Sequence, residues 1–242
     1  MRARALAGPL SLALAWLALP GGVAAAEETP REGPRLHLAL RTGFGLPLGT
    51  YADVRTLGGV ADTDNQISDD THGVIPLWLD IGYWLSSHLM LGGYFVYGVV
   101  LPKTASATDP LGGGCPRGLD CSASGVRFGL QAQYAFAPHS FVNPWLGLGV
   151  GYEWINSQIG GELFGLDFEA STSSSGLEFL HLQGGLDTRL APSFALGPFA
   201  AISAMQYTSC HVELSGEPAA CELDDAGWHG WVVFGVRGAL GL

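Results

Sequence analysis

After residue 26 the sequence lacks any apolar run long enough to cross a membrane as an α-helix, which needs about 20 such residues. Charge is also scarce, because only 14% of the 242 residues are Asp, Glu, Lys or Arg. The 11 basic residues are outnumbered by 22 acidic ones, and the net charge of −11 argues against binding to nucleic acid. Catalytic patterns such as G-x-S-x-G are missing, so we expect no enzymatic activity, no cofactor and no metal centre.

Apolar residues and glycine are abundant by contrast. Hydrophobic residues make up 48% of the chain, which also contains 36 glycines. High hydrophobicity without a membrane-spanning helix leaves two classes of protein. One is a soluble domain with a large core, and the other is a membrane β-barrel, whose strands give a weak, alternating signal.

The first 26 residues have the pattern of a secretory signal peptide. Arg2 and Arg4 form a basic start, residues 10–19 are an apolar run, and Ala24-Ala25-Ala26 is a small-residue cleavage site. We place cleavage after Ala26 and treat residues 27–35 as a short periplasmic leader. The mature protein is therefore expected to lie beyond the cytoplasmic membrane.

Four cysteines follow in this oxidising setting, and an even number predicts two disulfides. Three pairings are open, and proximity in the sequence favours Cys115 with Cys121 and Cys210 with Cys221. The close C-x-x-C spacing typical of zinc sites is absent.

Eight segments alternate between apolar and other residues with a period of two, which is the pattern of β-strands with two different faces. They cover residues 36–46, 73–85, 88–100, 125–136, 144–156, 177–190, 194–207 and 228–242. Long connections at about 47–72, 101–124, 157–176 and 208–226 alternate with short turns. An all-β, eight-stranded, antiparallel up-and-down transmembrane barrel spanning residues 36–242 explains this layout.

One face of every predicted strand is rich in leucine and free of charge, as contact with lipid requires. The other face carries glycine, small and polar residues, which suits the narrow interior of a small barrel. Its sparse charges form a predicted lumen network of Arg41, Asp80, Arg127, Glu153, Asp187, Arg189 and Arg237. Similar heights in the barrel predict pairing of Arg41 and Asp80 with Arg237, and of Arg127 with Glu153. The alternative is that these charges line a conducting path.

Aromatic residues of the apolar face lie near the strand ends and predict two interfacial girdles. They are Tyr83, Tyr134 and Phe136 at the short-turn end and Phe44, Tyr97, Tyr152, Trp154 and Trp228 at the long-loop end. Pro198 in the seventh strand predicts a bulge or a rim position, because a closed barrel has no free edge.

The long loops carry most of the acidic residues. In the first loop a calcium site is imaginable from Asp62, Asp64, Asn65, Asp69 and Asp70, but the spacing does not match an EF-hand. Divalent cations bridging the acidic loops to phosphorylated surface lipid remain an alternative to a simply solvated outer face.

With its signal peptide, eight alternating strands and asymmetric connections, the chain resembles the OmpA/OmpX-like eight-stranded outer-membrane barrels of Gram-negative bacteria. The resemblance implies a location in the cell outer membrane, contact with its lipid and insertion by the outer-membrane assembly machinery. We expect a monomer with a structural or surface-interaction role and a lumen plugged by side chains. A narrow porin-like channel for small solutes and a periplasmic lipocalin-like carrier are the alternatives.

Overall fold

The computed structural model describes residues 35–50, 54–55, 66–104, 114–163, 166–219, 221–223 and 227–241. The predicted signal peptide, most of the leader and Asp62, Asp64 and Asn65 lie outside these residues. The entire described fold lies in one compact unit, residues 33–242. No helix among the described residues has the length and apolar character needed to cross a membrane.

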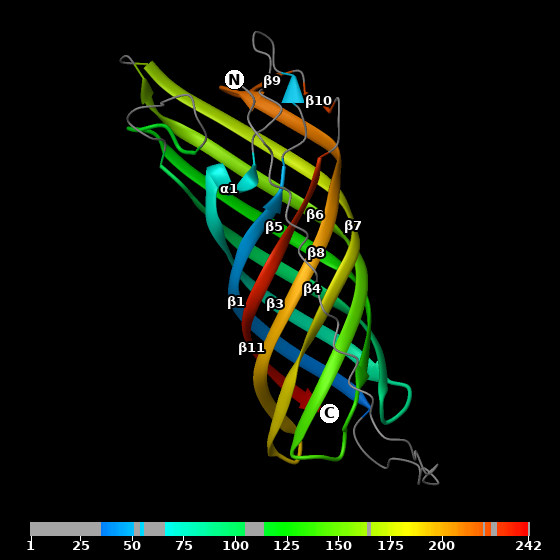
Figure 1. Ribbon diagram of the computed structural model, residues 1–242. Helices are drawn as coiled ribbons and strands as arrows, with labels where there is room; N and C mark the ends of the chain where they lie inside the picture. The colour runs from blue at the N-terminus through cyan, green and yellow to red at the C-terminus, as the bar shows by residue number, and fades with distance from the viewer. Residues whose placement is uncertain are drawn as a thin grey trace, which may run out of the picture. The chain divides into compact units, whose positions relative to one another are not determined.

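Eight antiparallel strands of this unit form a closed ring (Figure 1). In ring order they are β1 (Leu36–Gly49), β3 (Thr71–Trp84), β4 (Leu89–Pro102), β5 (Asp120–Ala135), β6 (Val142–Leu163), β7 (Leu166–Ala191), β8 (Phe194–Leu214) and β11 (Trp228–Gly241). Pairing of β11 with both β1 and β8 closes the ring. The predicted up-and-down barrel is therefore confirmed.

The two faces of the strands are distributed as their alternation predicts. In β1, for example, Leu40 is 56% exposed on the outside, whereas the neighbouring Arg41 is 2% exposed in the interior. Exposed large apolar residues from all eight strands cover the outer wall. Buried polar residues share the interior with a cluster that includes Trp78, Tyr94, Trp145 and Trp231.

This arrangement is that of a membrane barrel, since a soluble barrel directs its apolar residues inward. The aromatic girdles are supported by the outward exposure of Tyr83, Tyr134 and Phe136 at one end and of Phe44 and Trp228 at the other. Closure pairs the backbone groups of every ring strand, which lipid requires. The outer membrane, which the signal peptide and the resemblance predict, is the membrane that houses such barrels.

The third long loop is the main correction to the predicted layout. Residues 157–163 and 166–176 are not loop, because they belong to β6 and β7 and pair from Ser157–Thr172 to Leu163–Leu166. The fourth loop also begins later than expected, since β8 continues to Leu214. The prediction treated these segments as loop because of their many serines and glycines, although Leu166, Phe168 and Ala170 alternate with Asp167 and Glu169.

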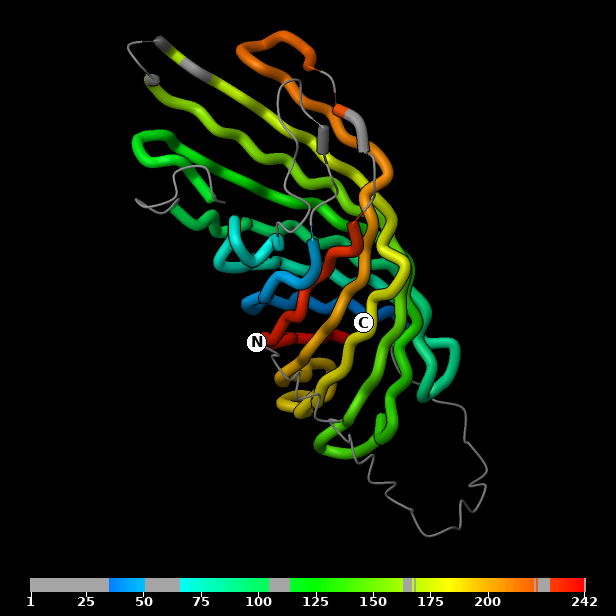
Figure 2. Tube along the Cα trace, turned by 45° about the horizontal axis from the view of Figure 1, so that its top comes forward, coloured from blue at the N-terminus to red at the C-terminus, as the bar shows by residue number. Residues whose placement is uncertain are grey.

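The ends of β6, β7 and β8 project beyond the other ring strands (Figures 1 and 2). We call residues 157–163, 166–176 and 208–214 the projecting sheet. The short strand β9 (Glu217–Ala219) pairs with the end of β8. Another pair, β2 (Val54–Arg55) with β10 (Glu222–Leu223), links the first and fourth long connections.

Both predicted disulfides are present on the long-loop side. Cys115 bonds to Cys121 at the start of β5, and Cys210 in the projecting part of β8 bonds to Cys221. Each therefore braces a single connection.

The short helix α1 (Ile67–Asp70) precedes β3. The Asp69 carboxylate accepts the Gln66 backbone N–H, and the Asp70 carboxylate accepts that of Gly114. The two aspartates of the imagined calcium site that the structure describes are thus engaged in local backbone hydrogen bonds.

Pro198 does not create the bulge that its position predicts. It pairs with Val236 of β11 in continuous register and is exposed on the outer wall. On its other side, the pairing of β7 with β8 is interrupted between Gly185–Phe199 and Thr188–Leu196. The missing N–H of proline is accommodated at this interruption.

Candidate functional site

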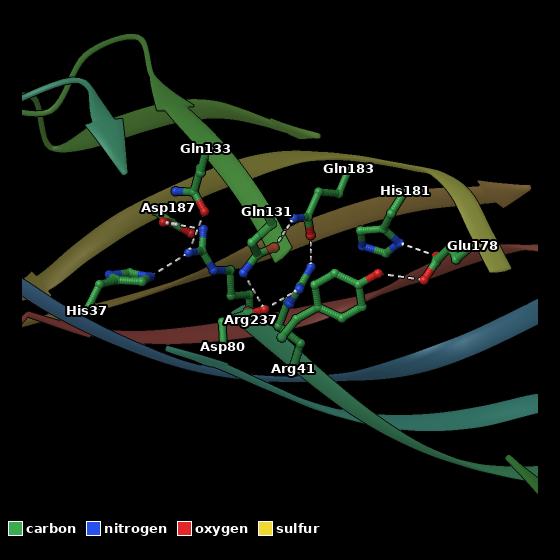
Figure 3. Close-up of polar contacts among 11 residues, drawn as sticks. His37, Arg41, Asp80, Gln131, Gln133, Glu178, His181, Gln183, Asp187 and Arg237 are labelled. Carbon is green, nitrogen blue, oxygen red and sulfur yellow. Dashed lines mark hydrogen bonds and ion pairs between the residues drawn. The ribbon is translucent and has the colours of Figure 1, made fainter. Parts of the chain in front are cut away.

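The interior of the barrel is the candidate site, and a ring of hydrogen bonds crosses its middle. Arg41 donates to the Asp80 carboxylate at 2.6 Å and to the Gln183 side-chain carbonyl. Gln183 in turn donates to Gln131, and Gln131 donates back to Asp80 at 2.9 Å. We call these four residues the middle layer; they come from β1, β3, β5 and β7 (Figure 3).

A second group, the lower layer, lies toward the short turns and is centred on Arg237 of β11. Arg237 forms a 3.0 Å ion pair with Asp187 and donates to the Gln133 side-chain carbonyl at 2.9 Å. Its other contact is with His37 Nε2 at 2.7 Å (Figure 3). Trp145 lies beneath the guanidinium, 4.2 Å from ring centroid to Cζ, and donates its indole N–H to Asp187 at 3.2 Å.

Separate carboxylates let two arginines occupy directly opposite positions. Arg41 and Arg237 are register partners on adjacent strands, an arrangement that is destabilising for like charges. Asp80 pairs with Arg41, and Asp187 pairs with Arg237. The predicted Arg41–Asp80 pair is therefore confirmed, while Arg237 has its own partner across the lumen.

A third group, the upper layer, lies toward the long loops around Arg127 of β5. The Arg127 guanidinium is 3.7 Å from the Glu153 carboxylate, as predicted, and 3.5 Å from that of Glu178. Each carboxylate also contacts one imidazole at 2.9 Å: Glu153 contacts His229 and Glu178 contacts His181. Every member of this layer is at most 5% exposed.

Large rings fill the space between the layers. Trp78 is fully buried, with the Arg41 guanidinium 4.9 Å and the Arg127 guanidinium 5.5 Å from its ring centroid. Tyr94 stacks on His181 with centroids 4.9 Å apart and donates to Glu178 at 2.6 Å. Arginine above an aromatic face is an attractive arrangement, so these rings both occupy volume and hold the charges in place.

Arg189 is the one predicted member that does not belong to the lumen network. Its side chain is exposed near the short turns and donates to the Pro138 carbonyl at 2.6 Å. The register of β7 with β8 shifts between Arg189 and Ala191, at the end of the strand. Alternation alone predicts the face of a residue but not that the strand has reached the rim.

Glu178 is the main residue that the sequence pattern missed. Alternation places it on the same face as Leu180 and Leu182, which are exposed, yet Glu178 is 1% exposed in the interior. An extra residue in β7 between Glu178 and Leu180 reverses the alternation. The polar residues Gln131, Gln133, Gln183, His37, His181 and His229 lie on the predicted inner face, and only their lack of formal charge kept them out of the predicted network.

The contacts that join these layers are ion pairs and hydrogen bonds. Among the residues that the structure describes, no group of three His, Cys, Asp or Glu side chains is arranged to hold a metal ion. Side chains from opposite walls meet across the lumen and neutralise each other's charges.

No protein-family model matches the chain, and no curated protein matches its sequence. Among solved structures, a major outer membrane protein from Thermus thermophilus aligns at 15% identity and a TM-score of 0.49, covering 85% of this chain and 99% of its own. The outer membrane protein OprG from Pseudomonas aeruginosa aligns at 16% identity and 0.44, covering 85% and 97%. The outer membrane protease OmpT from Escherichia coli aligns at 8% identity and 0.43, covering 88% and 98%.

Similarities of this size carry no argument about the activity of the chain. The resemblance to eight-stranded outer-membrane barrels is confirmed instead by the molecule itself. Its ring is closed, its outer wall is apolar, and its interior is polar.

Proposed function

We propose that the protein is a non-conducting outer-membrane barrel that carries a surface-interaction region on its projecting sheet. The observation that supports this most strongly is the middle layer, in which Arg41, Asp80, Gln131 and Gln183 are joined in a closed cycle of hydrogen bonds. The layers above and below it add ion pairs between further strands. A permeating solute would have to break several of these contacts together.

A channel would need free space beside the glycines of the inner face. That space is occupied by neighbouring side chains. A methyl group added to Gly147 would lie 2.8 Å from Gln183, and one added to Gly151 would overlap the Tyr94 hydroxyl. The glycines therefore make room for the plug rather than for a solute.

The carrier alternative requires a water-soluble outer wall, and the outer wall argues against it. Leu130 is 72% exposed, and Leu40 and Leu77 are each 56% exposed. We therefore expect the protein to contact outer-membrane lipid, to be inserted by the outer-membrane assembly machinery and to act as a monomer whose closed ring has no free edge.

The proposed interaction region is acidic. The projecting sheet and its neighbouring turns expose Asp120, Glu162, Asp167, Glu169, Glu213 and Glu217. Carboxylates of one sign favour basic partners or divalent cations bridging to phosphorylated lipid, and the two disulfides fix the connections nearby.

Planar-bilayer recording tests the non-conducting state. We expect residues 27–242 to give no discrete current steps at neutral pH, with insertion verified by protease protection and with an established porin conducting in the same bilayers. Substitution of both Gln131 and Gln183 by alanine opens the middle cycle and is expected to increase leakage. Reproducible steps from the unmodified protein would overturn the proposal and support the channel.

A further inference from the structure

A groove lies on the outer wall over β5, β6 and β7, which are neighbours in the ring. Its volume is about 570 Å³, and it is open along the side that faces the membrane. Outward apolar residues form its sides: Phe128, Leu130, Val150, Tyr152, Leu177 and Phe179. The groove opens directly onto the membrane-facing surface, because Leu130, Val150 and Phe179 are all exposed.

An irregularity in strand pairing accompanies the groove. Between the pairs Gly149–His181 and Gly151–Glu178, β6 has one residue where β7 has two. The extra residue bends a strand and interrupts its ladder locally. Gly151 also pairs with Gly129 of β5, so neither strand contributes a side chain at that point.

The inner end of the groove is closed by side chains of the plug. The Tyr94 hydroxyl would lie 2.5 Å from a methyl group added to Gly129 and would overlap one added to Gly151. The same hydroxyl donates to the buried Glu178 carboxylate at 2.6 Å. The groove is thus a blind recess with an apolar wall and a floor held by the upper layer.

We infer that this recess binds one acyl chain of a surrounding membrane lipid. The inference rests on the membrane location proposed above, because the recess is continuous with the apolar wall that contacts lipid. Three aromatic rings, Phe128, Tyr152 and Phe179, give it a rigid lining. A single chain that fits this lining gains van der Waals contacts that the mobile chains of the bulk bilayer make poorly. An acyl chain bound in the recess lies against Gly129 and Gly151. The contact between Tyr94 and Glu178 lies directly behind these two glycines.

Trp154 provides a reporter beside the recess. Its ring centroid lies 5.3 Å from that of Tyr152 and 6.2 Å from that of Phe128. The experiment measures tryptophan fluorescence of the full mature chain in phosphatidylcholine vesicles to which a fatty acid brominated at mid-chain is added in small, increasing amounts. The Trp154→Phe variant gives the signal of the other tryptophans, which is subtracted.

The expected result is quenching of Trp154 that rises more steeply than the mole fraction of the brominated fatty acid and then saturates. Val150→Phe narrows the recess and is expected to weaken the apparent affinity about tenfold or more. Ile81→Phe is the matched control, because Ile81 is equally outward on β3, is 51% exposed and is absent from the recess. Added oleic acid without bromine should restore the fluorescence of the unmodified protein.

Two failures are distinguishable. A protein that does not float with the vesicles would overturn the membrane location itself. An inserted protein whose quenching simply follows the mole fraction, or is not reversed by oleic acid, would overturn the acyl-chain site while leaving the membrane location intact.

Discussion

At the scale of single residues, the burial of Arg127 makes the clearest prediction. Arg127→Ala leaves the Glu153 and Glu178 carboxylates without their shared guanidinium, at positions that are 2% and 1% exposed. Removing one partner of a buried ion pair costs about 3–5 kcal/mol. We therefore expect a fall of this size in the free energy of unfolding, measured by urea titration in detergent micelles.

Arg189→Ala is the matched control for this loss. Arg189 is exposed at the rim, and its hydrogen bond to the Pro138 carbonyl contributes about 0.5–1.5 kcal/mol at most. Equal destabilisation by the two substitutions would contradict the distinction between a lumen arginine and a rim arginine.

The ion pairs were only partly predictable from these residues. Arg127 and Glu153 could be matched because they lie opposite each other in a hairpin with a short turn and unbroken register. The pairing of Arg237 with Asp187 could not be predicted, because β11 and β7 are not neighbours in the ring and the two side chains meet across the lumen. Alternation gives the face and approximate height of a side chain, whereas cross-lumen contacts depend on the length and direction of each side chain.

At the scale of strands, the glycine pair of β5 and β6 makes room for Tyr94. Gly151→Ala would place a methyl group over the Tyr94 hydroxyl and 2.6 Å from the Phe128 backbone carbonyl. Overpacking of this kind typically costs about 1–3 kcal/mol. We expect the unfolding midpoint in urea to fall accordingly, together with a change in the near-ultraviolet circular dichroism of the buried aromatic rings.

Gly125→Ala in the same pair of strands should be nearly silent, because its added methyl group would meet nothing closer than the Ile155 side chain at 3.4 Å. If both substitutions lowered stability alike, the effect would come from glycine in a strand generally, and the specific packing of Tyr94 would be refuted.

The strands themselves were predictable where lipid imposes alternation and were not predictable beyond it. All eight predicted segments lie largely within ring strands, because each has one leucine-rich face. Residues 171–175 of β7 are polar on both faces, so the pairing of Ser157 with Thr172 had no apolar pattern to indicate it. The bulge before Leu180 was equally hidden, since one additional residue leaves no compositional trace.

At the scale of the whole barrel, closure was predictable from the strand count and the alternating connections. The closed ring and the projecting sheet have different structural roles. The ring strands and the three interior layers form one cooperative unit. The projecting sheet is built from extensions of β6, β7 and β8, pairs along residues 157–160 with the start of β5, and contributes no residue to the interior layers. Stability and surface interaction should therefore be separable in this protein.

Replacement of residues 158–171 by Asn-Gly tests that separation. Ser157 and Thr172 are register partners, so a two-residue turn can join them, and Asn-Gly favours such a turn. The trimmed barrel should retain its interior layers and most of its unfolding free energy, because none of the removed residues belongs to those layers, although Asp120 to Ser122 of β5 lose their pairing partners. Binding of the protein to a basic partner, measured with polylysine, should weaken as three exposed carboxylates, Glu162, Asp167 and Glu169, are lost. A trimmed chain that fails to refold would show that the projecting hairpin is needed to close the barrel, and unchanged polylysine binding would assign the interaction to another part of the surface.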